Sequence, residues 1–358
     1  MKYGIIFLLI ITLFSCKKEA QKEFLISNIA HLKETEIYLA YGTGSSVRMD
    51  TIKVRGGRFV AMKSPEEAEP MTLYFPQSNL SVAFYGNADS RLTIAGDATM
   101  PENFLVQGDS VNNKLSEFRK SVRVELKSMR IAKSKADRSW FADSLKQYES
   151  TLFSQQQIQI RAQYKHKMQA FITRNPSTPE SLIALCDYLR LTNDYGALQL
   201  WWSKLNGNSV KDFSTFLELK KAYKSMLPLT VGRNIAAFQT YDRDNKQAYF
   251  YPEQQKKMLV MFWSSADKYS AFLNKKYAAA STQWSKDTVT YVGISLDDSF
   301  MEWKKASKDL KGKQIYVRGG FQNESIRNLG VPQTPCLVAL GKDTKIAKVY
   351  AIGESPLK

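Results

Sequence analysis

Cysteine and histidine, the side chains that most often bind metals or act as nucleophile and base, are scarce in this sequence. It has three cysteines and two histidines in 358 residues. His31 and His166 lie far apart in the chain, and His166 stands between two lysines. Two histidines so far apart are too few for a histidine-based metal site and do not indicate a catalytic triad. We expect no bound metal and no cofactor.

Long apolar runs are also lacking, and no segment approaches the roughly 18 apolar residues that a membrane-spanning helix needs. The longest run is at the start of the chain, where Lys2 precedes an apolar stretch over 5–13 that only Thr12 interrupts. Small Ser15 then stands directly before Cys16. This order predicts a signal peptide over residues 1–16.

The end of this leader resembles a bacterial lipobox, in which the chain is cut before the cysteine and a diacylglycerol is attached to its sulfur. The resemblance implies that Cys16 is lipidated and that its acyl chains anchor the protein stably in a membrane. The alternative is an ordinary secretory peptide with an incidental cysteine. Position 17 is lysine, and not the aspartate associated with inner-membrane retention. We therefore expect the outer membrane of the cell envelope, facing the periplasm, with the cell surface as the other orientation.

The charge is lopsided, with 51 Lys+Arg against 34 Asp+Glu and a formal net charge of +17. About half of this excess falls between Lys114 and Lys167. The pattern predicts the solvated faces of amphipathic helices. A weaker alternative is attachment of these helices to anionic lipid or polysaccharide. The sequence has no RNA-binding signature and no zinc-finger spacing, so nucleic acid is not an expected partner.

Residues 24–110 alternate short segments rich in β-branched and aromatic residues with glycine and proline turns. This pattern predicts an all-β domain, an antiparallel sandwich or barrel. The expected strands are residues 36–40, 50–54, 58–61, 71–75, 82–85 and 91–95.

Residues 113–228 predict a helical region, because apolar side chains recur there at three and four residues. A first helix begins at residue 113 and continues through Ala132. A second is expected over 137–173, with Phe141, Leu145, Tyr148, Leu152 and Ile158 on its buried side. Three shorter helices are expected over 181–191, 195–205 and 212–226. The neighbouring Trp201 and Trp202, and Cys186, are expected in the core.

Residues 230–358 predict a mixed α/β sheet, because strands and helices alternate and a hairpin follows. The apolar run over 258–263 is typical of a strand buried on both faces. The expected strands are 237–241, 258–263, 289–296, 315–317, 336–340 and 346–351, and the expected helices are 267–284, 300–310 and 323–329.

Two motifs in this part resemble the thioredoxin-like family of exported lipoproteins and membrane-tethered thiol–disulfide oxidoreductases. Residues 261–265 (MFWSS) match the strand before the redox loop, and residues 330–335 (GVPQTP) match the loop with the cis-proline. The resemblance covers residues 230–353, implies a thioredoxin-like fold, and places the cis-proline on Pro335.

The preceding β-rich stretch has Asp50-Thr51 before a strand, Gly57-Arg58-Phe59, and residues 106–112 (VQGDSVN) leading into a helix. In these features it is similar to a domain of unknown function that often precedes a thioredoxin-like domain in exported lipoproteins.

The same resemblance places the family's Cys-X-X-Cys on Asp267, Lys268, Tyr269 and Ser270. Thiol exchange needs a low-pKa thiolate that attacks and a second thiol that resolves the mixed disulfide. Asp267 can instead cap the helix, and Ser270 keeps the small volume of the second cysteine. These residues suit the fold but exclude dithiol redox chemistry.

Cys336 directly follows Pro335 and leaves one alternative open. It is either a single reactive thiol or an inert residue of a core strand, where free cysteine is common. After Gly353 only five residues follow, whereas the family normally adds a final helix. Either an upstream helix covers that sheet face, or the face is partly open as a partner site.

The sequence thus predicts a lipid-anchored envelope protein with a degenerate, non-catalytic thioredoxin-like domain that binds or scaffolds a protein partner. The alternative is a thiol–disulfide oxidoreductase or isomerase that works through Cys336 alone.

Overall fold

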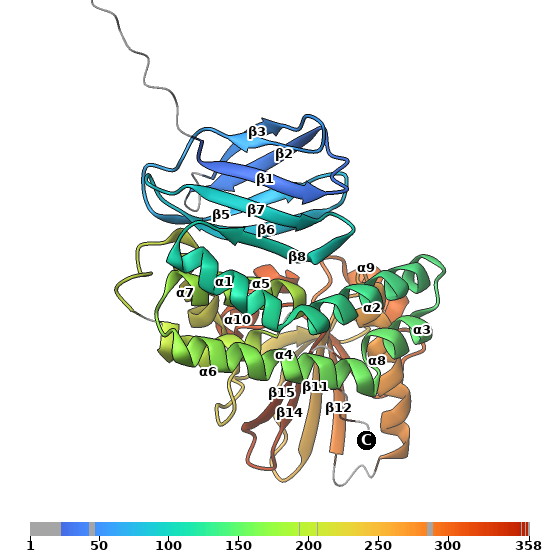
Figure 1. Ribbon diagram of the computed structural model, residues 1–358. Helices are drawn as coiled ribbons and strands as arrows, with labels where there is room; N and C mark the ends of the chain where they lie inside the picture. The colour runs from blue at the N-terminus through green and yellow to red at the C-terminus, as the bar shows by residue number, and fades with distance from the viewer. Residues whose placement is uncertain are drawn as a thin grey trace, which may run out of the picture.

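The computed structural model describes residues 23–42, 47–192, 194–205, 207–284, 289–351, 353–354 and 356. The predicted leader, with Cys16, lies outside the described residues. Within them, no helix is both long and apolar enough to cross a membrane. From top to bottom, Figure 1 shows a β-rich layer, a layer of helices and a large mixed sheet.

The β-rich layer consists of two four-stranded sheets, ordered β4-β1-β7-β8 and β3-β2-β5-β6. Alternating side chains point inward, so that Ile37, Leu39 and Tyr41 of β2 enter one core shared by both sheets. The strands are β1 (Leu25–Ala30), β2 (Glu36–Tyr41), β3 (Arg48–Lys53), β4 (Val60–Ala61), β5 (Glu69–Phe75), β6 (Leu80–Gly86), β7 (Leu92–Asp97) and β8 (Met100–Gln107).

One pairing differs from the predicted antiparallel pattern. β1 runs parallel to β7, with Leu25 opposite Leu92 and Ala30 opposite Asp97. A parallel neighbour requires a long connection, and here the intervening chain forms β2 to β6 before returning to β1. Sequence alternation specifies which side chains face the core, but not which strands become neighbours.

The helical layer packs against β6 and β8 through α1, α2 and α5. Polar contacts join these layers: Ser116 of α1 accepts from the backbone N–H of Val106 and donates to its carbonyl (3.0 and 2.7 Å), and Arg130 forms two hydrogen bonds to the buried Glu102. The helices are α1 (Ser110–Ser121), α2 (Arg123–Phe141), α3 (Leu145–Leu152), α4 (Gln155–Arg174), α5 (Pro179–Thr192), α6 (Tyr195–Leu205) and α7 (Ser214–Met226), followed by the 3-10 turn η2 (Leu227–Leu229).

The prediction of one helix over 137–173 was wrong. The chain turns after α2, where Asp143 adopts a left-handed conformation (φ 59°), and short α3 and long α4 follow. The predicted buried side is also wrong at two positions, since Phe141 is 86% exposed and Ile158 is 40% exposed. Apolar periodicity cannot locate such a turn. The turn changes which face of α2 and which face of α3 meets the core, and a repeat read through it assigns the wrong side chains to the buried side.

The large sheet has the strand order β10-β9-β13-β12-β11-β14-β15, and β11 lies between parallel β12 and antiparallel β14. Every residue of β11 from Met258 to Trp263 is buried. The elements are β9 (Phe238–Tyr241), β10 (Gln247–Phe250), β11 (Lys257–Trp263), α8 (Lys268–Ala280), η3 (Ser281–Gln283), β12 (Val289–Ser295), α9 (Phe300–Ser307), β13 (Lys313–Tyr316), η4 (Gly320–Gln322), α10 (Glu324–Leu329), β14 (Cys336–Leu340) and β15 (Ile346–Tyr350).

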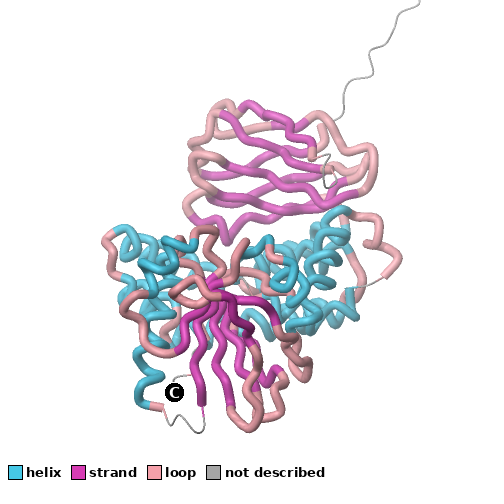
Figure 2. The backbone as a smooth tube through the Cα atoms, turned by 180° about the vertical axis from the view of Figure 1, so that it is seen from behind, coloured by secondary structure: helices cyan, strands magenta, loops and turns pink. Residues whose placement is uncertain are grey.

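The two faces of this sheet carry separate cores, and Figure 2 shows helices on its two sides. Leu259, Met261 and Trp263 of β11 pack against α8 and α9, together with aromatic residues of the helical layer. Val260 and Phe262 point to the other face, which α10 and η2 cover. At Gly330, an added Cβ would lie 2.0 Å from the carbonyl oxygen of Ser225, so glycine lets α10 approach the end of α7.

We predict opposite outcomes for two aromatic truncations in the helical layer. Trp201→Ala should lower the free energy of unfolding by about 3–5 kcal/mol, because its 1% exposed side chain leaves a cavity. Phe141→Ala should change it by less than about 0.5 kcal/mol. Urea denaturation of both variants checks this, and a large loss in Phe141→Ala would contradict the described turn after α2.

Candidate functional site

The segment 267–270, where the resemblance places a redox motif, forms the start of α8. Asp267 is the N-cap of this helix, and its carboxylate accepts from the backbone N–H of Tyr269 at 3.0 Å. Burial raises the pKa of Asp267, although hydrogen bonds from the backbone of Ser270 and Tyr269 oppose this shift. Asp267 thus satisfies the N-terminal end of α8 at the position where the resemblance places the first cysteine of the motif.

Ser270 is fully buried and holds the end of β11 in place. Its hydroxyl accepts from the backbone N–H of Ser264 at 3.1 Å. Nearby, the carboxylate of Asp297, 3% exposed, accepts from the Ser264 hydroxyl, the Ser265 backbone and the Ser295 hydroxyl, each at 2.7 Å. All of these groups are occupied in shaping the chain between β11 and α8. The Asp297 carboxylate here acts as a structural hydrogen-bond acceptor that holds Ser264 and Ser295 in place.

Tyr269 is the residue of this segment that the helical layer covers. Its ring lies 5.4 Å from that of Tyr148 in α3 and 5.8 Å from that of Phe153, measured between centroids. Trp140 of α2 packs on Tyr148 at 5.2 Å. We call Trp140, Tyr148, Phe153 and Tyr269 the aromatic cluster. Since Tyr269 is only 6% exposed, the cluster closes the start of α8 on this side.

Ion pairs flank the aromatic cluster and join the same two parts of the chain. Lys276 of α8 donates to both carboxylate oxygens of Glu149 in α3, at 2.8 and 2.9 Å. Lys268 forms a more exposed pair with Asp143 at 3.2 Å. Such exposed pairs contribute little energy, so they orient α3 on α8 while the rings supply most of the packing.

Phe153 is confined from a second side by the chain that follows β15. A Cβ at Gly353 would lie 1.8 Å from the Phe153 ring, and Gly353 has a φ of 85°. Glycine alone fits both the backbone conformation and the close approach.

Arg161 of α4 completes this region. Its guanidinium lies 5.0 Å from the centroid of the Phe153 ring, and burial lowers its pKa. Within the described residues its Nε and the Tyr269 hydroxyl have no hydrogen-bond partner. The cation–π contact stabilises the charge of this buried guanidinium, whose other charged or titratable neighbours are Tyr148, Tyr188 and Tyr269.

Pro335 and Cys336 lie at the start of β14. The Thr334–Pro335 peptide bond is cis. Cys336 is 5% exposed and pairs in register with Phe262, in the core on the face opposite Tyr269. Burial raises the pKa of its thiol to about 12, which leaves almost no thiolate at neutral pH.

Cys186 in α5 is the other free cysteine among the described residues, and it is only partly buried rather than in the core where the sequence placed it. Burial raises the pKa of its thiol to about 12 as well. It belongs to the helical layer and Cys336 to the large sheet, and the described structure contains them as separate free thiols.

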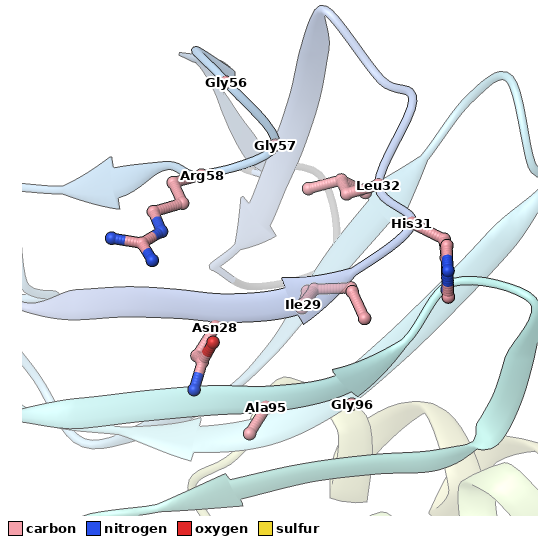
Figure 3. Close-up of a pocket in the computed structure, with 10 residues that line it drawn as sticks. Asn28, Ile29, His31, Leu32, Gly56, Gly57, Arg58, Ala95 and Gly96 are labelled. Atoms are coloured by element: carbon pink, nitrogen blue, oxygen red, sulfur yellow. The ribbon is translucent and has the colours of Figure 1, made fainter.

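A cavity of about 710 Å³ lies at one end of the β-rich layer, beside the C-terminal end of β1 (Figure 3). Asn28, Arg58 and the Gly56–Gly57 turn line it. His31 also lines it, but its Nδ1 lies 3.1 Å from both carboxylate oxygens of Asp97. The cavity offers one cation and one amide to a polar ligand, with no nucleophile in its lining. Sequence analysis did not identify it.

A second cavity, of about 550 Å³, lies where β11, β14 and β15 meet, and Trp284, Ala339 and Tyr350 contribute to it. It lies on the sheet face that carries Leu259, Ala339 and Tyr350. This is the face for which the sequence did not show whether an upstream helix covers it. Helices α8 and α9, with the aromatic cluster, cover most of that face, and this corner is hollow.

In the described part of the chain, no three His, Cys, Asp or Glu side chains are grouped to hold a metal ion.

Sequence analysis identified the segment 267–270 and Pro335, but it missed the aromatic cluster. The only signal for it was the concentration of aromatic residues at 140, 148 and 153. The predicted helix over 137–173 placed Tyr148 on a buried side but did not show which residues it packs against. The packing partner of Tyr269 could not be inferred from it.

Residues 255–346 match a family model described as thioredoxin-like. No curated protein matches the chain.

Several solved structures resemble part of it. The thioredoxin domain of a thiol-disulfide oxidoreductase from Bacteroides vulgatus is 20% identical, with 34% of this chain and 87% of that chain covered and a TM-score of 0.31. A thiol-disulfide oxidoreductase from Bacteroides fragilis is 18% identical, covering 33% and 89%, with a TM-score of 0.30. A thioredoxin-like protein from Bacteroides caccae is 12% identical, covering 57% and 83%, with a TM-score of 0.39. By the family model and the described sheet, the C-terminal domain of this protein is thioredoxin-like.

Proposed function

We propose that this protein is a lipid-anchored component of the cell envelope whose thioredoxin-like domain is a non-catalytic scaffold. The observation that carries the proposal is the burial of Tyr269 in the aromatic cluster. In the positions that would need an attacking and a resolving thiol, the chain has the helix cap Asp267 and the buried Ser270. The start of α8 then serves as the surface on which the helical layer docks.

The scaffold joins the parts of the chain in a fixed order. The β-rich layer contacts the helical layer through α1, α2 and α5, and the helical layer contacts the thioredoxin-like domain through the aromatic cluster and through α7 against α10. Two separate contacts to the same domain restrict its rotation more than one would. We propose that this rigid body presents its surface to a protein partner in the envelope.

The alternative function, a monothiol oxidoreductase using Cys336, is disfavoured by burial. The thiol points into the core on the sheet face away from Tyr269 and has a raised pKa. An attacking thiol needs both exposure and thiolate character.

The full chain should not accelerate the reduction of insulin by dithiothreitol, followed by turbidity. Cys336→Ser is the matched control and should give the same baseline rate. An acceleration that disappears in Cys336→Ser would contradict the proposal and establish the monothiol alternative. As an independent readout, Ellman's reagent should label Cys336 at least about tenfold more slowly in the native chain than in urea, because the buried thiol is protonated.

The proposed anchor rests on the leader pattern that ends at Cys16, and it implies attachment to the outer membrane, facing the periplasm. Cells that express the full chain and are fed labelled palmitate should incorporate the label into the protein. Cys16→Ser should lose the label completely, whereas Cys186→Ser should keep it. An unlabelled wild-type chain would support an ordinary secretory peptide, and label in Cys16→Ser would place the lipid elsewhere.

A further inference from the structure

The outward face of α2 combines positive charge with exposed apolar side chains. Phe141 and Val124, 86% and 77% exposed, are the two most exposed large hydrophobic residues in the described part of the chain, and Ile131 on the same helix is 40% exposed. Exposed apolar side chains that share one helix face are typical of a surface that contacts a partner or a membrane. Figure 1 shows α2 at the front of the helical layer, with no other element drawn over it.

Helix geometry places these residues together with cations. At 100° per residue, Val124, Lys127, Ile131, Lys135, Arg138 and Phe141 fall within about a third of the helix circumference. Met129, Ala132 and Ala136 occupy the opposite side and are buried. The helix has 19 residues and is therefore about 28 Å long. The outward face is thus a straight strip of alternating basic and apolar side chains.

No carboxylate lies on this strip. Glu125 is buried on the inner side and pairs with Lys167 of α4 at 2.6 Å. Asp137 lies at the flank and pairs with Lys133 at 3.4 Å. Lys127 and Lys135 form no ion pair within the described residues, and Arg138 donates only to the carbonyl of Ser134. The cations of the strip are therefore available to an external anion.

We propose that this face of α2 lies on the surface of a membrane that contains anionic lipids. Long Lys and Arg side chains can reach phosphate groups while Phe141 and Val124 enter the boundary between headgroups and acyl chains. Each cation near an anionic surface strengthens binding. A convex helix face on which basic and apolar side chains alternate suits a flat, deformable surface better than a fixed protein groove, which would require a continuous apolar stripe. The proposal does not depend on lipidation of Cys16.

Sedimentation of the full chain with phosphatidylcholine vesicles, with and without phosphatidylglycerol, tests it. The leader contributes equally to every variant and cancels in the comparison. The triple variant Lys127→Gln/Lys135→Gln/Arg138→Gln should lose roughly a hundredfold of the binding that phosphatidylglycerol adds. The matched control Lys211→Gln/Lys221→Gln/Lys224→Gln removes the same charge from exposed positions before and within α7 and should lose less than about threefold.

Phe141→Ser keeps all charges and should weaken vesicle binding by about tenfold, and raised salt should weaken the wild-type chain by screening. Circular dichroism melting should be unchanged in every variant, because the altered side chains are exposed. Equal losses in both triple variants would show attraction to net charge alone and overturn the proposal. Binding to poly-aspartate without binding to vesicles would overturn it in favour of an acidic protein partner.

Discussion

The packing of Tyr269 against Tyr148 and Phe153 is the contact on which the arrangement of this protein depends. It joins the first turn of α8 to the chain around α3, two segments more than a hundred residues apart in the sequence. The rings remove a large apolar area from water, and aromatic pairs add further stabilisation beyond that area. The backbone at Gly353 packs closely against the Phe153 ring and limits its movement. The helical layer is thereby fixed on the end of the sheet at which β11 leads into α8.

The polar residues around this contact are likewise engaged in holding the structure together. Asp267 caps α8, Ser270 and Asp297 hold the end of β11, and each is engaged by backbone or hydroxyl groups. A catalytic thiolate would need an unblocked, electropositive position. Here the positive end of the helix is satisfied by a carboxylate, and the thiol of Cys336 on the neighbouring strand β14 faces the opposite core. This geometry supports the proposal of a rigid connector rather than a redox centre.

Much of the thioredoxin-like domain could be predicted, because its signals are local. The apolar run over 258–263 predicts a strand buried on both faces, and β11 has that position; Asp267 is placed to cap a helix, and it does. The helical layer was harder. Phe141 lies on an apolar repeat yet faces solvent, because the turn at Asp143 resets the register. The partner of Tyr269 could not be predicted, since periodicity identifies an apolar face but not the distant segment that covers it.

The most direct test of this account is a double-mutant cycle on the free energy of unfolding, with Phe153→Leu, Tyr269→Leu and the combined variant measured in urea. The account predicts a coupling of about 0.5–1.5 kcal/mol between the two rings. Additive losses, with a coupling within about 0.3 kcal/mol of zero, would contradict the claim that this contact holds the helical layer on the thioredoxin-like domain.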